Sequence, residues 1–286
     1  MSSALIVNPR ASRVSDDAVD HVARILRVGD VLRTERAQHA TELAAALAGA
    51  ERIYVFSGDG GFNEVLNGAP AGAALGFVPG GGTSVLPRAL GLPRDPLEAA
   101  RRLAQGHTRR ISVGRANGRR FGFSAGIGLD AELIRRMDAR GRDATGQRPG
   151  DLMFAWTALQ ALAAHRMRFE PLLEIEGHGS ASFALVANSD PYSYVGRLPL
   201  RLPRGADLEG GLDLLAPRRF RPRHLPGAVR YLLTGRTGIP LVTLHDEDRI
   251  EIRCLEPMPL QVDGEDLGDV TEVVLEAERD AVDVLV

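Results

Sequence analysis

Residues 53–68 read Ile53-Tyr54-Val55-Phe56-Ser57-Gly58-Asp59-Gly60-Gly61-Phe62-Asn63-Glu64-Val65-Leu66-Asn67-Gly68. The apolar run predicts a short strand, the glycines a tight turn, and the remainder a helix. Glycines let a backbone approach a ligand closely, and free N–H groups at a helix N-terminus bind anions such as phosphate. Asp59 would repel phosphate unless a cation lies between them. The stretch therefore predicts a nucleotide phosphate site with a divalent metal.

A second turn of the same kind follows, and it reads Leu75-Gly76-Phe77-Val78-Pro79-Gly80-Gly81-Gly82-Thr83. Residues 84–90 then predict another helix. Two successive strand–turn–helix units place both glycine turns at the carboxyl edge of one parallel sheet, where open α/β sheets bind ligands. One glycine turn alone is more often only a tight connection, but two in tandem favour a binding site.

Length and composition limit the class of protein. The 286 residues suffice for two domains, and 44% hydrophobic with 25% charged residues is typical of globular proteins. A net charge of −2 gives no basic footprint for nucleic acid. No apolar run approaches the roughly eighteen residues of a membrane span, and residues 1–7 lack the features of a signal peptide. We therefore expect a cytoplasmic protein.

Cysteine and lysine usage excludes several kinds of chemistry. The single cysteine, Cys254, alternates with Ile250 and Ile252, which predicts a small core residue on a strand. All 35 basic residues are arginines, so no Schiff-base lysine and no P-loop lysine exist. Phosphoryl charge must then be met by backbone N–H groups, arginine and metal.

The pattern of predicted strands and helices changes near residue 108. Residues 1–108 alternate apolar runs with helical stretches, which predicts an α/β domain with a parallel sheet. Residues 109–286 carry short β-like runs, interrupted by predicted helices at 130–139 and 151–164 and by a loop at 140–150. We expect a mainly antiparallel β domain with inserted helices, and the family resemblance described below implies that it is a β-sandwich.

Several motifs, in their shared order, resemble one family. They are Leu5-Ile6-Val7-Asn8-Pro9, Ser57–Gly60 with Asn63-Glu64 and Asn67-Gly68, Pro79–Pro93, Phe123–Ala131, Gly210–Asp213, and Val262-Asp263-Gly264-Glu265. Over nearly its whole length the chain resembles the lipid kinases of the diacylglycerol kinase and sphingosine kinase superfamily, especially the soluble bacterial branch. NAD kinases share the Gly-Asp-Gly turn.

The resemblance implies an ATP-binding α/β domain, a lipid-binding β-sandwich and a cleft between them. It implies Mg²⁺-dependent transfer of the γ-phosphoryl group of ATP to the hydroxyl of a lipid such as diacylglycerol, with transient contact to a membrane surface. Glu265 is then the candidate catalytic base, and Asp59 the catalytic metal ligand. Without the resemblance, Asp263-Gly264 is a hairpin turn signal flanked by solvated acids.

The candidate nucleotide-binding residues come from the Asn8-Pro9 turn after the first strand and from the two glycine turns. They are Asn8, Pro9, Ser57, Gly58, Asp59, Gly60, Gly61, Glu64, Gly80, Gly81, Gly82, Thr83 and Arg88. Glu64 could equally serve the helix that it opens, and Arg88 could equally be a solvated surface residue. The seven histidines show no metal-ligand spacing, and no amphipathic basic helix stands out.

Four departures from the family pattern bear on activity. Gly61 and Gly82 stand where the family prefers threonine, and Ser112 and Gly210 stand where it carries aspartate. They keep open a catalytically weak or inactive nucleotide- or lipid-binding protein on the same scaffold. A NAD kinase is disfavoured by the later motifs. A dinucleotide oxidoreductase lacks its Gly-x-Gly-x-x-Gly turn after the first strand.

Overall fold

A computed structural model describes residues 2–139, 151–196, 198–236 and 238–286. The loop predicted at 140–150 lies outside these ranges. The described chain forms two compact units. The N-terminal unit comprises residues up to Val113 together with Arg279–Val286, and the C-terminal unit comprises residues from Gly114 to Glu278. The end of the chain thus returns to the N-terminal unit, which a single boundary at residue 108 does not include.

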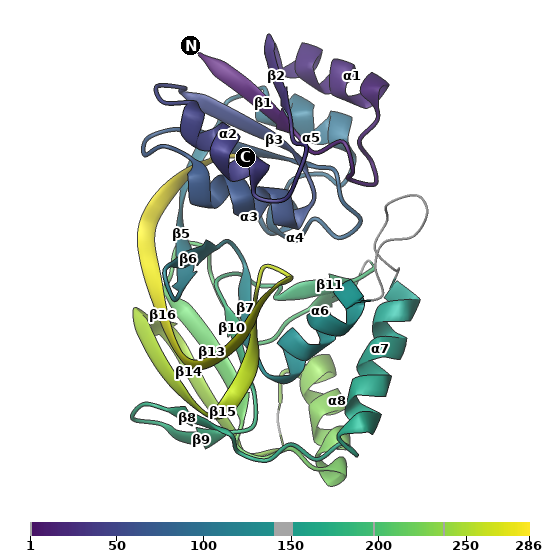
Figure 1. Ribbon diagram of the computed structural model, residues 1–286, viewed down its shortest axis with the longest axis vertical. Helices are drawn as coiled ribbons and strands as arrows, with labels where there is room; N and C mark the ends of the chain where they lie inside the picture. Colours follow the sequence, from purple (N-terminus) through teal and green to yellow (C-terminus); the bar gives the residue numbers. More distant parts are fainter. Residues whose placement is uncertain (1, 140–150, 197, 237) are drawn as a thin grey trace. The chain divides into compact units, whose positions relative to one another are not determined.

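The N-terminal unit is an α/β sheet whose elements are drawn in Figure 1. Its elements are β1 (Ser3–Val7), α1 (Asp16–Leu26), β2 (Asp30–Arg33), α2 (His39–Ala46), β3 (Arg52–Ser57), α3 (Asp59–Gly68), β4 (Ala74–Pro79), α4 (Val85–Ala89), α5 (Pro96–Leu103) and the start of β5 (Thr108–Ala116). The strands lie parallel in the order β4-β3-β1-β2, and the end of β16 (Glu265–Leu285) joins beside β4.

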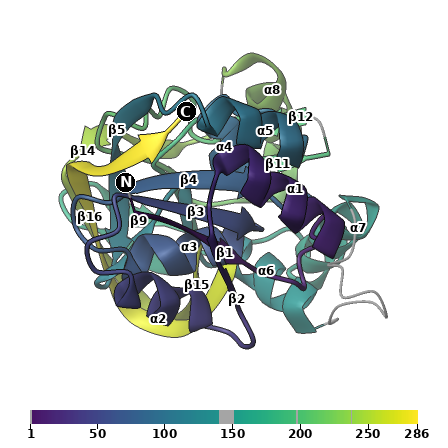
Figure 2. The same cartoon turned by 90° about the horizontal axis from the view of Figure 1, so that it is seen from above.

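Helices cover both faces of this sheet. Helix α1 packs with α5 and α2 packs with α3, and Figure 2 shows the strands between these two pairs. Strands covered on both faces are apolar throughout, as in β4, where all six residues are buried. The strand order reverses direction between β1 and β3. The carboxyl ends of these two strands are therefore the topological switch point, the place where open α/β sheets bind ligands.

The C-terminal unit is built on a mainly antiparallel sheet. Its elements are β6 (Arg119–Phe121), β7 (Ser124–Ile127), α6 (Leu129–Ala139), α7 (Asp151–Ala164), β8 (Leu173–Ile175), β9 (Gly179–Ala181), β10 (Ala184–Ala187), β11 (Ser193–Val195), β12 (Leu198–Leu200), β13 (Leu212–Pro217), a 3₁₀ turn (Pro222–His224), α8 (Leu225–Thr234), β14 (Leu241–Glu247), β15 (Arg249–Val262) and most of β16. The sheet runs β14-β13-β10-β7-β15-β16, with every pairing antiparallel. The predicted α/β unit followed by a mainly antiparallel one is confirmed.

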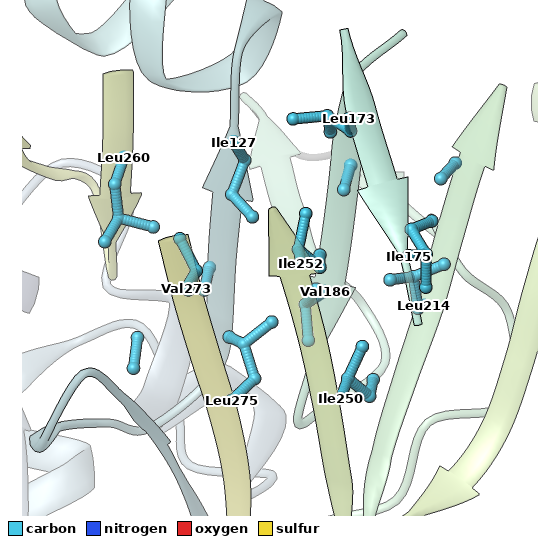
Figure 3. Packing of buried hydrophobic residues seen from close by; sticks show 14 of the residues in the cluster. Ile127, Leu173, Ile175, Val186, Leu214, Ile250, Ile252, Leu260, Val273 and Leu275 are labelled. Carbon is cyan, nitrogen blue, oxygen red and sulfur yellow. The ribbon is translucent and has the colours of Figure 1, made fainter. Parts of the chain in front are cut away.

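Alternating apolar residues of these strands form the core of the C-terminal unit (Figure 3). Ile250, Ile252 and Cys254 point into it from β15, as their spacing predicts, and burial raises the pKa of the Cys254 thiol to about 11. A separate cluster of three phenylalanines, Phe169, Phe183 and Phe220, lies between the sheet and the helices. No helix among the described ranges is long and apolar enough to cross a membrane.

Candidate functional site

The Asn8-Pro9 turn after β1 and the two glycine turns meet at the switch point. The amide of Asn8 donates to the carbonyl of Phe56 at 3.0 Å, and the amide of Gly80 donates to the carbonyl of Ser57 at 2.7 Å. The amide of Arg13, beyond the first turn, donates to the carbonyl of Gly80 at 2.9 Å. The ends of β1, β3 and β4 are therefore joined directly by backbone hydrogen bonds, as the sequence predicts for one sheet edge.

Three glycines permit this close approach. A Cβ atom on Gly81 would lie 2.9 Å from the Cα of Gly58, and one on Gly80 would lie 2.8 Å from the carbonyl oxygen of Ser57. A Cβ on Gly61 would lie 2.1 Å from the Oγ of Ser57. A Cβ on Gly82, by contrast, would meet nothing within 4 Å. The presence of glycine rather than threonine at position 61 is therefore explained by packing, because the Ser57 side chain occupies the space that a threonine would need.

The Ser57 hydroxyl is an unusual group in this turn. Ser57 is 2% exposed, and its Oγ has no hydrogen-bond partner among the described residues. Buried polar atoms are nearly always bonded, so an orphaned hydroxyl at a ligand-binding edge indicates a missing partner. It lies beside Gly61, in the first turn of α3, where backbone N–H groups have no partner within the helix. These features fit the phosphates of a nucleotide.

Asp59 links the two glycine turns. It is the first residue of α3, and its Oδ1 accepts a hydrogen bond from the amide of Val85 at 2.7 Å. Val85 opens α4, whose N-cap residue, Ser84, has a positive φ of 47° and makes no side-chain cap. The Asp59 carboxylate thus caps α4 from across the site.

No group of three or more His, Cys, Asp or Glu side chains converges in the described ranges. A Mg²⁺ ion at Asp59 would therefore take its other ligands from phosphate and water, as this ion commonly does.

Glu64 has a clear structural function. Its two carboxylate oxygens accept from the amides of Gln38 and Ala40, each at 3.0 Å, at the start of α2. The Thr41 hydroxyl donates to the Glu64 carbonyl at 2.9 Å. The N-cap position of α2, Gln38, makes no side-chain cap of its own. Glu64 therefore replaces a local cap and holds α2 against α3.

The remaining candidates in this unit differ in their surroundings. Asn8 Oδ1 accepts from the amide of Arg10 at 3.0 Å, which closes the turn that contains exposed Pro9. Thr83 and Arg88 are half-buried, Thr83 in the second glycine turn and Arg88 in the last turn of α4. The hydroxyl of Ser112, wholly buried in β5, accepts a long hydrogen bond of 3.4 Å from the amide of Asp280.

In the C-terminal unit, Glu265 follows a tight turn. Asp263 and Gly264 have positive φ values of 48° and 78°, and Val262 pairs with Glu265 across the hairpin. The Asp263 carboxylate is buried and accepts from the amides of residues 122, 123 and 124 at 2.7, 3.0 and 3.1 Å. Glu265 is a quarter exposed and forms an ion pair of 2.5 Å with Arg119. Of these two acids, Glu265 is the more exposed.

A buried polar network supports this turn, and the sequence did not reveal it. Gln261 accepts from the amide of Gly264 at 2.9 Å and donates to Asp130 Oδ2 at 2.6 Å. The Tyr192 hydroxyl also donates to Asp130 Oδ2 at 2.6 Å. Burial raises the pKa of Asp130 against the effect of these two donors. Burial, with the nearby Asp130 charge, raises the pKa of Tyr192. The glycine at position 126 is a feature of the sequence that reflects this network. A side chain there would collide with Asp130, because a Cβ would lie 2.2 Å from Asp130 Oδ2.

Asp213, in the motif with Gly210, is satisfied without a metal. Both its oxygens lie within 2.9 Å of the His245 Nδ1 atom, and Oδ1 also accepts from the amide of Asp246 at 2.9 Å. The histidine therefore partners this buried carboxylate, and the hydrogen bond to Asp213 raises the pKa of His245.

Comparison with known proteins finds one matching family and several similar proteins. Residues 2–116 match the family described as "Diacylglycerol kinase catalytic domain". A Bacillus subtilis (strain 168) protein named "Diacylglycerol kinase" is 29% identical over 281 residues, which cover 91% of this chain and 88% of that one. These two similarities support the diacylglycerol kinase-like lipid kinase superfamily for this chain. A Staphylococcus carnosus (strain TM300) diacylglycerol kinase is 38% identical over 74 residues, 25% of this chain and 24% of that protein.

Two solved structures share the fold of this chain. A Bacillus anthracis (strain Sterne) diacylglycerol kinase structure has a TM-score of 0.72 at 21% identity, covering 99% of this chain and 96% of that chain. An Archaeoglobus fulgidus NAD kinase in complex with ATP has a TM-score of 0.53 at 12% identity, covering 99% and 93%. Both similarities concern the fold.

Proposed function

We propose that this protein is an ATP-dependent lipid kinase, which transfers the γ-phosphoryl group of ATP to a hydroxyl of diacylglycerol or a related lipid. The observation that carries the proposal is the phosphate cradle: the orphaned Ser57 hydroxyl and the close-packed glycine turns at the sheet's switch point, with Asp59 between them. Similarity to the lipid kinase superfamily supports it.

In this proposal the residues of the cradle position the nucleotide. Gly58, Gly80 and Gly81 leave room for phosphate against the backbone, and the first amides of α3 with the Ser57 hydroxyl donate to its oxygens. Asp59 would hold Mg²⁺, which neutralises charge on the phosphates when bound. Arg88, on α4, is the candidate cation for a phosphate oxygen.

The proton of the acceptor passes to Glu265. The lipid hydroxyl oxygen forms the new bond to γ-phosphorus, the bond from γ-phosphorus to the β–γ bridging oxygen breaks, and ADP leaves with that electron pair. Arg119 keeps Glu265 oriented, and the ionised carboxylate is the form that accepts a proton.

The alternative is a binding protein on the same scaffold with weak or no turnover. It is favoured by Ser112, whose hydroxyl is buried in β5 against a backbone amide where the family carries a carboxylate. The experiment below separates the two functions.

The test measures transfer of labelled phosphate from ATP, with Mg²⁺, to a panel of extracted lipids. Asp59→Asn should lower turnover by at least about a hundredfold. The asparagine keeps an oxygen for the Val85 amide, so the fold should persist. Asp95→Asn is the matched control, because Asp95 caps α5 in the same unit through the amides of Leu97 and Glu98, and asparagine caps equally well.

Labelled lipid with the parent protein and with Asp95→Asn, but not with Asp59→Asn, supports the kinase and identifies the lipid class. Full activity in Asp59→Asn would refute the metal function. ATP binding by calorimetry without any labelled lipid would favour the binding protein.

A further inference from the structure

Helix α8 presents an apolar face to solvent. Leu225, Val229, Leu232 and Leu233 are exposed by 39, 46, 42 and 77%, respectively. Their spacing places them on one side of the helix. Ala228 packs against the cluster of three phenylalanines, and Tyr231 packs against a second buried cluster that includes Leu185 and Leu215. The helix is thus anchored by these two residues, and its large aliphatic residues stay outside.

Helix α7 has the same arrangement. Met153, Trp156 and Leu159 are exposed by 39, 53 and 54% at helical spacing, while Leu162 packs on the phenylalanine cluster that also receives Ala228. Figure 1 shows both helices in the C-terminal unit. We name these seven exposed side chains of α7 and α8 the apolar helix face.

The two segments that carry this face contain arginines and no acids. Residues 214–245 contain six arginines and no Asp or Glu, and residues 152–169 contain two arginines and no Asp or Glu, in a chain whose net charge is −2. Arg219 and Arg221 pair with Glu170. Four exposed arginines of these segments have no carboxylate partner in the part of the chain that the structure describes: Arg166, Arg168, Arg230 and Arg236.

We infer that the apolar helix face docks on the surface of a bilayer that contains anionic lipids. Apolar side chains enter the boundary between headgroups and acyl chains, tryptophan favours this boundary, and arginines bind lipid phosphates. A second copy of the chain is a poorer occupant, because a symmetric contact would bring arginines against arginines. That the bilayer also carries the phosphoryl acceptor rests on the proposed function; the docking surface does not.

The test is co-sedimentation with vesicles in the absence of nucleotide. The parent protein should bind phosphatidylglycerol–phosphatidylcholine vesicles and bind pure phosphatidylcholine at least about tenfold less, because arginine attraction requires anionic lipid. The fluorescence of Trp156, the single tryptophan of the chain, should shift to shorter wavelength on docking.

Two double variants examine the two contributions. Leu232→Ser with Leu233→Ser, and Arg230→Glu with Arg236→Glu, should each lower the partition coefficient at least about tenfold. Leu255→Ser is the matched control: Leu255 is 58% exposed on β15 of the same unit, and its loss should change binding less than about twofold. Circular dichroism confirms that each variant is folded.

Equal vesicle binding by the parent and both double variants would overturn the inference, as would absence of binding to anionic vesicles. A concentration-dependent dimer in sedimentation, lost in the Leu232→Ser, Leu233→Ser variant, would assign the face to a second copy and would also overturn it. Turnover of a monomeric short-chain diacylglycerol separates this inference from the proposed function. An inactive protein that docks refutes only the kinase, and an active one that does not dock refutes only the docking surface.

Discussion

At the scale of single residues, the turn between β15 and β16 gives two neighbouring acids different surroundings. Asp263 is enclosed and accepts three backbone amides, so it holds the strand entering β7 against the hairpin. Glu265 is a quarter exposed and is paired with Arg119. The motif Asp-Gly-Glu therefore combines one buried and one partly exposed carboxylate, a distinction that the sequence alone does not make.

Glu265→Gln should lower kcat about 10²–10⁴-fold and leave the ATP dissociation constant nearly unchanged, because glutamine keeps the size but cannot accept the proton. Steady-state kinetics with calorimetry measure both. The matched control is Glu278→Gln, since Glu278 is also arginine-paired and its side chain is 23% exposed against 25% for Glu265. Loss of ATP affinity in Glu265→Gln, with kcat preserved, would exclude Glu265 as the base.

His245 should titrate above its ordinary value of 6.5, because its hydrogen bond to Asp213 raises its pKa. Since the raised pKa belongs to the folded state, the pair stabilises the fold fully below about pH 6.5 and loses this effect as pH rises through the raised value. An NMR titration should show the midpoint falling in Asp213→Asn and falling less in Asp246→Asn, whose charge is a smaller cause. The same midpoint in all three proteins would show that the pair has no effect.

At the scale of elements, the glycine turns are shaped by packing between segments. Gly81 touches Gly58 across the switch point, whereas Gly82 next to it faces open space. Gly81→Ala should therefore lower the free energy of unfolding by about 1–3 kcal/mol and weaken ATP binding. Gly82→Ala should change stability by less than about 0.5 kcal/mol. Urea denaturation and calorimetry compare the pair, and equal stability losses would contradict the contact between the turns.

Most elements were predictable, and the exceptions have physical reasons. The helices at 129–139 and 151–164 have clear helical spacing and were predicted within a residue. Helix α8 was missed because its apolar residues are divided between exposed and packed sides, so no clean polar face marks it. The Pro191–Pro203 stretch contains the short hairpin β11–β12, which its prolines made hard to see.

At the scale of the whole molecule, the end of the chain completes the N-terminal unit. Leu285 is wholly buried, its neighbour Val284 pairs with Leu75 of β4, and a Cβ on Gly76 would lie 3.3 Å from a methyl of Leu285. The N-terminal unit thus depends on residues that follow the entire C-terminal unit in sequence.

Leu285→Ala should lower the free energy of unfolding by about 2–5 kcal/mol, because it leaves a cavity in the sheet core. Hydrogen exchange should accelerate in β3 and β4 of the N-terminal unit. Leu255→Ala, at the exposed β15 position, should change stability by less than about 0.5 kcal/mol. Exchange that accelerates only in the C-terminal unit would contradict this packing.

The strand–turn–helix order, the two glycine turns, the antiparallel second half and the family resemblance could all be predicted from the amino-acid sequence, because these features are encoded within short runs of residues. The partner of each polar residue in those runs depends on the folded chain. Asp59 caps a helix 26 positions away, Glu64 caps one 24 to 26 positions before it, and Arg119 pairs with an acid 146 positions later. Such partners depend on which strands become neighbours, and burial of apolar surface by the whole chain, rather than any local pattern, selects those neighbours.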